Sequence, residues 1–175
     1  MVTYKDKLTD FYTKLARDKR VIFIGYNTAY GSRMYGTLAR VKKSQCIETP
    51  VAEDLMVGLS IGYALTGYRP VLCIERHDFL FHALDGLINH MDKMSTLGAG
   101  KVHVLVRAIV GDKTHLDVGV QHSQCYTGVL ASMLKHTPVL TLSEYGIDDI
   151  LPTMKRSESG SLVLIEHRSL YGERG

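Results

Sequence analysis

Cysteine is scarce in this sequence and is not arranged in a ligand or disulfide pattern. The chain has three cysteines, Cys46, Cys73 and Cys125, with no CxxC spacing. An odd number without that spacing argues against a disulfide framework and against a zinc site, so we predict no metal site built by this chain. Three reduced thiols are expected, as in a protein of the cytoplasm.

Long apolar runs and an excess of one charge are also missing. No run is long or apolar enough to span a membrane, and the N-terminal segment carries charges where a signal peptide needs apolar residues. The 21 basic and 18 acidic residues leave a net charge of only +3. The densest basic stretch, 40–43, has no interleaved aromatic residues, which argues against a nucleic-acid surface. We therefore expect neither a membrane nor a nucleic acid as a partner.

Buried strands alternate with helices along the chain, which is long enough for one domain, 1–175, with its own core. Apolar periodicity and glycine or proline breaks predict helices at 4–19, 52–66, 79–97, 123–134 and 147–155. Short β-branched runs predict strands at 21–24, 71–74, 102–106, 139–142 and 162–165. This order predicts an α/β fold, a three-layer αβα domain with a mostly parallel sheet. Ligands of such folds bind beyond the carboxyl ends of the strands, here the loops after Gly25, Ile74 and Arg107.

The segment ETPVAE places Glu53 near the start of a predicted helix. Thr49 is a candidate N-cap, with Pro50 at the first helical position. A carboxylate there can serve a site, or it can simply complement the helix dipole. Gly58 and Gly62 follow on one face of the same helix. They permit close packing either on the chain's own sheet or on a second subunit.

Two further segments carry aromatic or imidazole side chains at the expected ligand edge. Phe79 and Phe81 point in different directions, so that both lie in the core or one of them faces a pocket. The polar segment VQHSQC places His122 at the start of a predicted helix, where the dipole keeps an imidazole neutral. His122 is then a hydrogen-bond partner, a proton shuttle or only a surface cap. Neither phosphate-binding motif, GxGxxG or GxxxxGK[ST], occurs in the chain.

In order, these motifs resemble the N-terminal domain of 2-oxoacid dehydrogenase beta subunits and, more broadly, the pyrimidine-binding domain of transketolase-like enzymes. The resemblance covers 21–172: VIFIG and AYG, ETPVAE, the two glycines, ALTGYRPV, DFLFHALDGLIN, GVQHSQ and VLIEHRSLYG. It implies a thiamine-diphosphate-dependent enzyme in which Glu53 bonds the cofactor aminopyrimidine. It also implies that Phe79 stacks on that ring and that His122 faces the substrate, with Glu53 and His122 as the catalytic residues.

The resemblance also implies a partner chain. Gly111, Asp112 and Lys113 are not followed by the glycine and asparagine that complete the metal–diphosphate motif of these enzymes. Diphosphate and magnesium are therefore expected mainly on a diphosphate-binding alpha-type subunit, in a hetero-oligomer with two copies of each chain (α₂β₂). The expected substrate is a 2-oxo acid or a ketose, and the reaction is decarboxylation, dehydrogenation or aldehyde transfer.

Some residues depart from the dehydrogenase pattern. His77 stands where an aromatic residue is usual, and Glu75 brings a charge to a position that is usually apolar. The C-terminal domain of those subunits is missing from this sequence. If the chain ends naturally here, a decarboxylase or carboligase is favoured over coupling to an acyltransferase core. Two alternatives remain open: a catalytically silent structural or regulatory subunit, and a flavodoxin-like or nucleotide-binding domain, which the missing phosphate loop argues against.

Overall fold

A six-stranded parallel sheet forms the centre of the molecule. The computed structural model describes residues 2–112, 119–142 and 144–173. The strands are β1 (Val21–Gly25), β2 (Cys46–Glu48), β3 (Arg69–Ile74), β4 (Leu105–Val110), β5 (Val139–Thr141) and β6 (Leu162–His167). They are ordered β2-β1-β3-β4-β6-β5, and each neighbouring pair is parallel. The predicted α/β fold is therefore confirmed.

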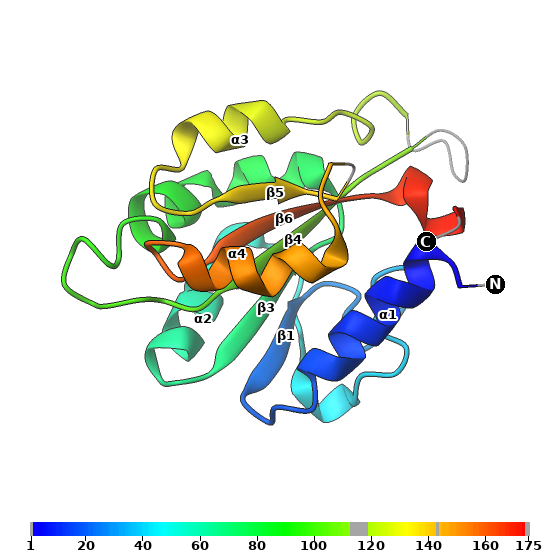
Figure 1. Cartoon of the computed structure of the whole chain (residues 1–175), viewed down its shortest axis with the longest axis horizontal. Coiled ribbons are helices and arrows are strands. Elements are labelled where there is room, and N and C mark those ends of the chain that lie inside the picture. The colour runs from blue at the N-terminus through cyan, green and yellow to red at the C-terminus, as the bar shows by residue number, and fades with distance from the viewer. Residues whose placement is uncertain (1, 113–118, 143, 174–175) are drawn as a thin grey trace.

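Helices cover both faces of this sheet (Figure 1). The α-helices are α1 (Tyr4–Leu15), α2 (Glu53–Leu65), α3 (Thr127–Met133) and α4 (Ile150–Arg156). Shorter helical segments are η1 (Lys43–Gln45), η2 (His77–Ala83), η3 (Gly86–Met91), η4 (Ile147–Asp149) and η5 (Arg168–Gly172). Residues of α2, η2, η3 and α3 share one core cluster, and those of α1, α4 and η5 share the other. The three layers follow from this division.

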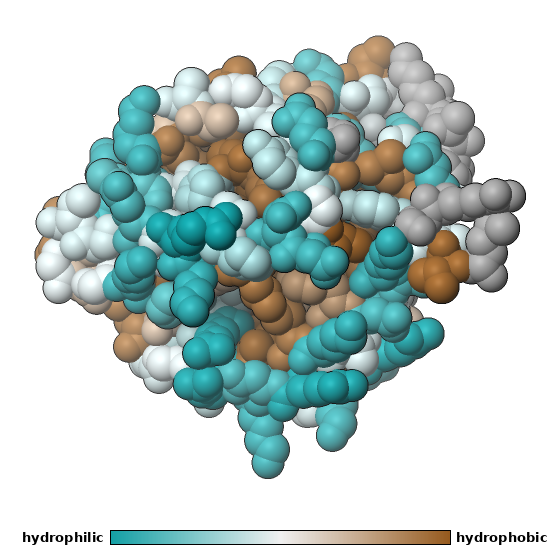
Figure 2. Space-filling view, viewed as in Figure 1, coloured by the Kyte–Doolittle hydropathy of each residue, from teal (hydrophilic) through white to brown (hydrophobic). Residues whose placement is uncertain are grey.

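The strands supply both core clusters by alternation. In β3, Leu72 and Ile74 face the α2 layer, whereas Val71 and Cys73 face the α1 layer. A strand covered on both sides needs apolar residues at every position, which explains its continuous apolar run. On the α1 and α4 face, hydrophobic residues are visible between hydrophilic ones, where a groove of about 510 Å³ opens between the two helices (Figure 2).

The structure contains one strand that was not predicted, places the strand predicted at 102–106 at Leu105–Val110, and divides one predicted helix. Strand β2 was not predicted, because it has only three half-buried residues and lacks an apolar run. The single helix predicted at 79–97 is instead the 3₁₀-helix η2 followed by the π-helix η3. At Gly86 a Cβ atom would lie 2.7 Å from Cγ1 of Val57, so η3 approaches α2 more closely than a side chain allows. That contact favours the broken helix over a continuous one.

A buried ion pair fixes the α1 layer beneath the sheet. Arg107 of β4 donates to Glu166 of β6 at 2.7 Å, and both side chains are 0% exposed. The hydroxyl groups of Tyr12 and Tyr171 each donate to Glu166 at 2.5 Å. A further nitrogen of Arg107 donates to Thr37 at 3.0 Å. Charges removed from water need such partners, and this network ties α1 and η5 to the two central strands.

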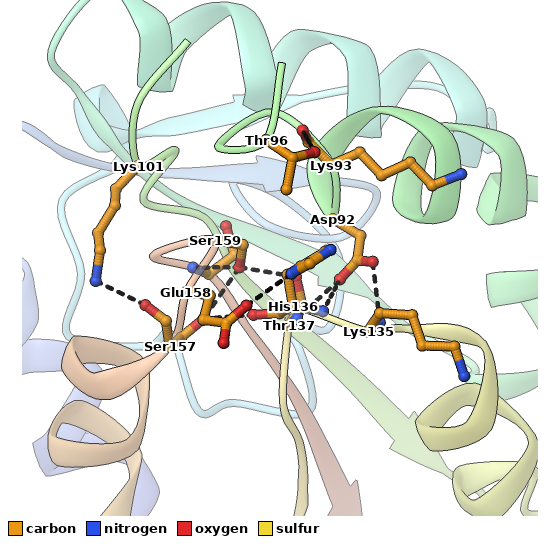
Figure 3. A network of polar contacts seen from close by, with 11 residues as sticks. Asp92, Lys93, Thr96, Lys101, Lys135, His136, Thr137, Ser157, Glu158 and Ser159 are labelled. Atoms are coloured by element: carbon orange, nitrogen blue, oxygen red, sulfur yellow. Dashed lines mark hydrogen bonds and ion pairs between the residues drawn. The ribbon is translucent and has the colours of Figure 1, made fainter. Parts of the chain in front are cut away.

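A second polar network lies at the amino ends of β5 and β6 (Figure 3). The buried carboxylate of Asp92, directly after η3, accepts backbone N–H groups of Lys135, His136 and Thr137 at 3.0, 2.9 and 2.7 Å. The Thr137 hydroxyl donates to Ser159 at 2.8 Å. These bonds fasten η3 to the start of β5. They lie at the edge opposite to the carboxyl ends of the strands, so they are structural.

Candidate functional site

The carboxyl edge of the sheet gathers the residues that the sequence singled out. Strand β2 ends at Glu48, and helix α2 begins at Glu53, with four residues between them. Segment η2, which carries Phe79, follows β3 after only two residues. Helix α2 packs directly against η2 and η3. The predicted site residues therefore come from adjoining elements at one edge of the sheet.

Glu53 is the first residue of α2 and is only 5% exposed. The predicted Thr49 cap is wrong, because the N-cap is Ala52. The backbone N–H of Thr49 instead donates to the carbonyl of Gly25 at 3.2 Å, which extends the pairing of β2 with β1. That bond keeps Thr49 in the sheet, outside the helix.

Among the described residues, the Glu53 carboxylate makes no hydrogen bond and no ion pair. The adjacent Asp54 is exposed and also lies in the first turn, so it can complement the helix dipole from water. Glu53 is only 5% exposed, but its oxygens are not among the fully buried polar atoms that lack partners. The carboxylate therefore keeps contact with solvent, and it can complement the helix dipole as well as serve a site.

Phe79 and His122 meet at this edge. Their ring centroids lie 5.3 Å apart with an interplanar angle of 80°. Because α3 begins only at Thr127, His122 lies in the preceding turn and not at a helix N-terminus. The predicted dipole effect on its protonation is therefore wrong. Its Nδ1 atom is buried without a hydrogen-bond partner in the described chain.

Two other rings of η2, those of His77 and Phe81, contact Tyr126. The sequence did not single out Tyr126. His77 stacks on Tyr126 with 5.9 Å between centroids and an interplanar angle of 19°. Phe81 meets the same ring edge-on at 4.6 Å. Phe79 packs against the α2 core cluster, but Phe81 is 43% exposed. The interpretation that both phenylalanines lie in the core is wrong.

His77 is buried and neutral at physiological pH. It is 1% exposed, and neither ring nitrogen has a hydrogen-bond partner among the described residues. Burial, which removes water from the charged form, lowers the pKa of His77 to about 4, although Asp78 opposes the shift. An imidazole of this kind can offer one donor and one acceptor to another molecule.

Two glutamates that sequence reasoning did not assign hold the loop after β1. Glu48 accepts the backbone N–H groups of Asn27, Thr28 and Ala29 at 2.6, 3.0 and 2.7 Å. Glu75 accepts the side-chain amide of Asn27 at 3.0 Å with each oxygen. Asn27 has a φ of 58°, a turn conformation that such side-chain bonds stabilise. Glu48 is therefore committed to a structural role, whereas Glu53 in the same motif is not.

The arrangement matches a known family. Residues 2–174 match the family model described as transketolase, pyrimidine binding domain. The chain belongs to this family. As a transketolase-type pyrimidine-binding domain, it carries Glu53, Phe79 and His122 in elements that adjoin at one edge, as the resemblance in the sequence implied. Their individual roles stay predictions.

Curated relatives of this pyrimidine-binding domain include pyruvate dehydrogenase beta subunits. The mitochondrial E1 component beta subunit of Drosophila melanogaster is 30% identical over 166 residues, which cover 91% of this chain and 44% of that protein. The mitochondrial beta-1 subunit of Oryza sativa subsp. japonica is 30% identical over 141 residues, 79% of this chain and 37% of that protein. The chain thus spans less than half the length of these two relatives.

A solved structure shares the fold of the pyrimidine-binding domain. It is described as a split gene transketolase, inactive beta4 tetramer, and it aligns with a TM-score of 0.64. The alignment covers 92% of this chain and 50% of that chain, with 15% sequence identity. This likeness concerns the fold.

The glycine pair of the pyrimidine-binding domain faces outward. A Cβ atom added at Gly58 or Gly62 would meet nothing within 4 Å. Both glycines line a groove of about 880 Å³ between α2 and η3, together with the exposed Leu55. Packing on the chain's own sheet therefore does not explain these glycines, and the subunit-contact interpretation stays open.

Buried polar atoms without partners concentrate around the same edge. Within the described residues they belong to Tyr35, Thr49, Arg76, His77, Asp78, His122 and Arg168 there, besides Arg107 in the ion-pair network. Native proteins contain few such atoms, and each requires an explanation.

The described residues form no group of three or more His, Cys, Asp or Glu side chains able to hold a metal ion. None of the described helices is long and apolar enough to cross a membrane.

Proposed function

We propose that this chain is the beta-type subunit of a split thiamine-diphosphate-dependent enzyme and that it activates the cofactor aminopyrimidine together with a diphosphate-binding partner chain. The observation that carries the proposal is Glu53, a residue only 5% exposed at the carboxyl edge whose carboxylate makes no hydrogen bond or ion pair among the described residues. The family match and the beta-subunit relatives support it.

The described residues fit an aminopyrimidine ring. Such a ring needs an acid at one ring nitrogen and an apolar surface against its face. Glu53 is an uncommitted buried acid, and Phe79 is a half-buried ring on the adjoining η2. When bound, thiamine diphosphate supplies the carbanion chemistry, and the protein supplies binding, orientation and electrostatics.

Each side chain has a defined task in this proposal. Glu53 hydrogen-bonds ring nitrogen N1′ of the aminopyrimidine and shares a proton with it. Phe79 supports the ring face. His122, whose ring contacts Phe79, hydrogen-bonds the substrate or relays a proton to it.

The partner chain completes the site. No phosphate motif occurs in this sequence, and the described residues offer no metal cluster. Diphosphate and magnesium are therefore assigned mainly to an alpha-type subunit, and the cofactor spans the interface. The outward glycines of α2 line an open groove that a second subunit can fill in an α₂β₂ hetero-oligomer.

The substrate is a 2-oxo acid or a ketose. The names of the beta-subunit relatives favour a 2-oxo acid and a decarboxylation or dehydrogenation. The name of the split gene transketolase that shares the fold is compatible with the second reaction class, aldehyde transfer from a ketose. Both reactions use the same activated cofactor.

Calorimetric titration with thiamine diphosphate and magnesium tests the split site. The isolated chain is expected to bind negligibly, and a mixture with its partner is expected to bind the cofactor. A chain carrying GDG and a downstream asparagine, encoded beside this one, is the partner to test. Tight binding by the isolated chain would overturn the split-site proposal.

The alternative function is a catalytically silent subunit with a structural or regulatory role. It requires the same assembly but no contribution of Glu53 or His122 to turnover. A reconstituted complex whose activity is insensitive to substitution of both residues would support this alternative and contradict the catalytic proposal.

A further inference from the structure

The segment 119–126, which carries His122, is held together by its own hydrogen bonds. The carbonyl of Gly119 accepts the N–H of His122 at 3.4 Å and the hydroxyl of Ser123 at 3.0 Å. The carbonyl of Val120 accepts the side-chain amide of Gln124 at 3.2 Å. These bonds are local, so they shape the segment without attaching it to the rest of the domain.

Two residues of the segment, His122 and Tyr126, contact rings of η2, and their contacts are unequal in number. His122 meets only the ring of Phe79, edge to face. Tyr126, four residues later, contacts both His77 and Phe81, with centroids 5.9 and 4.6 Å away. His77 is 1% exposed, so one of the two rings that Tyr126 contacts is buried in the domain. The larger attachment is therefore at Tyr126 and not at the candidate catalytic residue.

Tyr126 also links the segment to the helix that follows. Its hydroxyl donates to the side-chain carbonyl of Gln124. Its backbone carbonyl accepts the N–H of Leu130 at 3.0 Å, which forms the first turn of α3. The core residue Leu130 anchors that turn in the α2 layer. Tyr126 is thus the residue through which segment 119–126 contacts both η2 and α3.

The geometry points to Tyr126 as a positioning residue that sets the place of His122 against Phe79 by clamping its ring on His77 and Phe81. Tyr126 acts through His122 and is assigned no contact with substrate or cofactor. Its ring carries this role, because the ring makes both contacts to η2, whereas its hydroxyl bonds only Gln124 within the segment. The consequence for turnover rests on the proposed function, but the geometric part does not.

NMR of the histidine-labelled full chain tests the geometry without a partner. A ring 5.3 Å from His122 displaces the imidazole proton shifts, and Phe79→Leu identifies that displacement by removing it. Tyr126→Phe should retain the displacement and Tyr126→Ala should lose it. If the alanine variant does not fold, Tyr126→Leu replaces it, because leucine keeps an apolar side chain beside His77 and Phe81 but has no ring. An unchanged His122 shift in a folded alanine or leucine variant would overturn the inference.

The reconstituted complex tests the consequence for turnover. Tyr126→Ala should lower kcat by about 10- to 100-fold, the range expected when a reacting group is misplaced by about 1 Å, with cofactor affinity unchanged. Combining it with His122→Ala should add no further loss, since both changes remove the same group. Full turnover in Tyr126→Ala, with His122→Ala impaired, would overturn the inference. Full turnover in His122→Ala would instead overturn the assignment of His122 in the proposed function.

Discussion

The imidazole of His122 lies edge-on to the ring of Phe79, with 5.3 Å between the ring centroids. The two residues are 43 positions apart in the sequence and come from different elements of the carboxyl edge. The residue proposed to face the substrate therefore touches the residue proposed to support the cofactor ring.

Removal of the His122 imidazole tests its part in the reaction. In the reconstituted complex, His122→Ala should lower turnover by roughly ten- to ten-thousandfold, the usual contribution of a general acid–base group. Cofactor affinity should barely change, because the proposal assigns the cofactor ring to Glu53 and Phe79. His136→Ala is a matched control, since that imidazole pairs with exposed Glu158 at the opposite edge. Equal turnover in the two variants would reduce His122 to a structural residue.

The outward glycines of α2 predict a subunit contact. Gly62→Leu should leave the chain folded, because an added Cβ meets nothing within 4 Å and leucine favours a helix over glycine. It should nevertheless release smaller species from the assembled complex in light scattering. Gly128→Leu is the control, because Gly128 is also helical and open but lies on α3 outside the groove. Dissociation by both variants, or by neither, would contradict the predicted contact.

The buried imidazole of His77 predicts acid sensitivity of the fold. The pKa of His77 falls to about 4 in the folded chain, whereas an unfolded histidine titrates near its ordinary value of 6.5. Between these values the unfolded chain binds more protons, so stability falls as pH falls from about 6.5 towards 4. Burial also lowers the pKa of His167, which adds to the same dependence.

Replacing His77 by phenylalanine should weaken that dependence. His77→Phe keeps a ring on Tyr126 and removes two buried nitrogens that lack partners. We expect the free energy of unfolding at pH 7 to rise by about 1–3 kcal/mol, the usual cost of an unsatisfied buried group. Urea unfolding of the isolated chain at several pH values measures both effects. A variant that is less stable at pH 7, with an equally steep loss in acid, would contradict this account.

The apolar strands of the fold could be predicted from the sequence. The short edge strand β2 and the start of the helix that follows it could not. Runs such as Val21–Gly25 are apolar at every position, and only a doubly covered strand requires this pattern. The three residues of β2 carry no such signal, because their pairing with β1 supplies the strand. The Thr49 cap failed for the same reason: a bond from Thr49 to distant Gly25 outweighed a local preference.

Some residues of the candidate site could likewise be selected from the sequence, and others could not. Glu53, Phe79 and His122 could be selected because their motifs resemble a family. Tyr126 and Glu48 could not, because their roles depend on contacts with segments 18 to 49 residues away, which spacing along the chain does not reveal. The burial of Glu53 also required the structure, since first-turn acids are usually exposed.

The central claim is that Glu53 activates the cofactor, and Glu53→Gln tests it. Glutamine keeps the size of the side chain but cannot exchange a proton with ring nitrogen N1′. The assembled variant should keep its fold and most of its cofactor affinity. Asp54→Asn is the matched control, since Asp54 is the exposed neighbouring acid in the same helical turn. If both acids only complement the helix dipole, each change should cost about 0.3–1 kcal/mol of stability and leave the chemistry intact.

The most direct measurement is hydrogen–deuterium exchange at the thiazolium carbon of thiamine diphosphate in the assembled enzyme, followed by NMR after acid quench. The account predicts severely slowed exchange in Glu53→Gln and normal exchange in Asp54→Asn. Normal exchange in a folded, cofactor-bound Glu53→Gln complex would contradict it, and the catalytic assignment of Glu53 would have to be withdrawn.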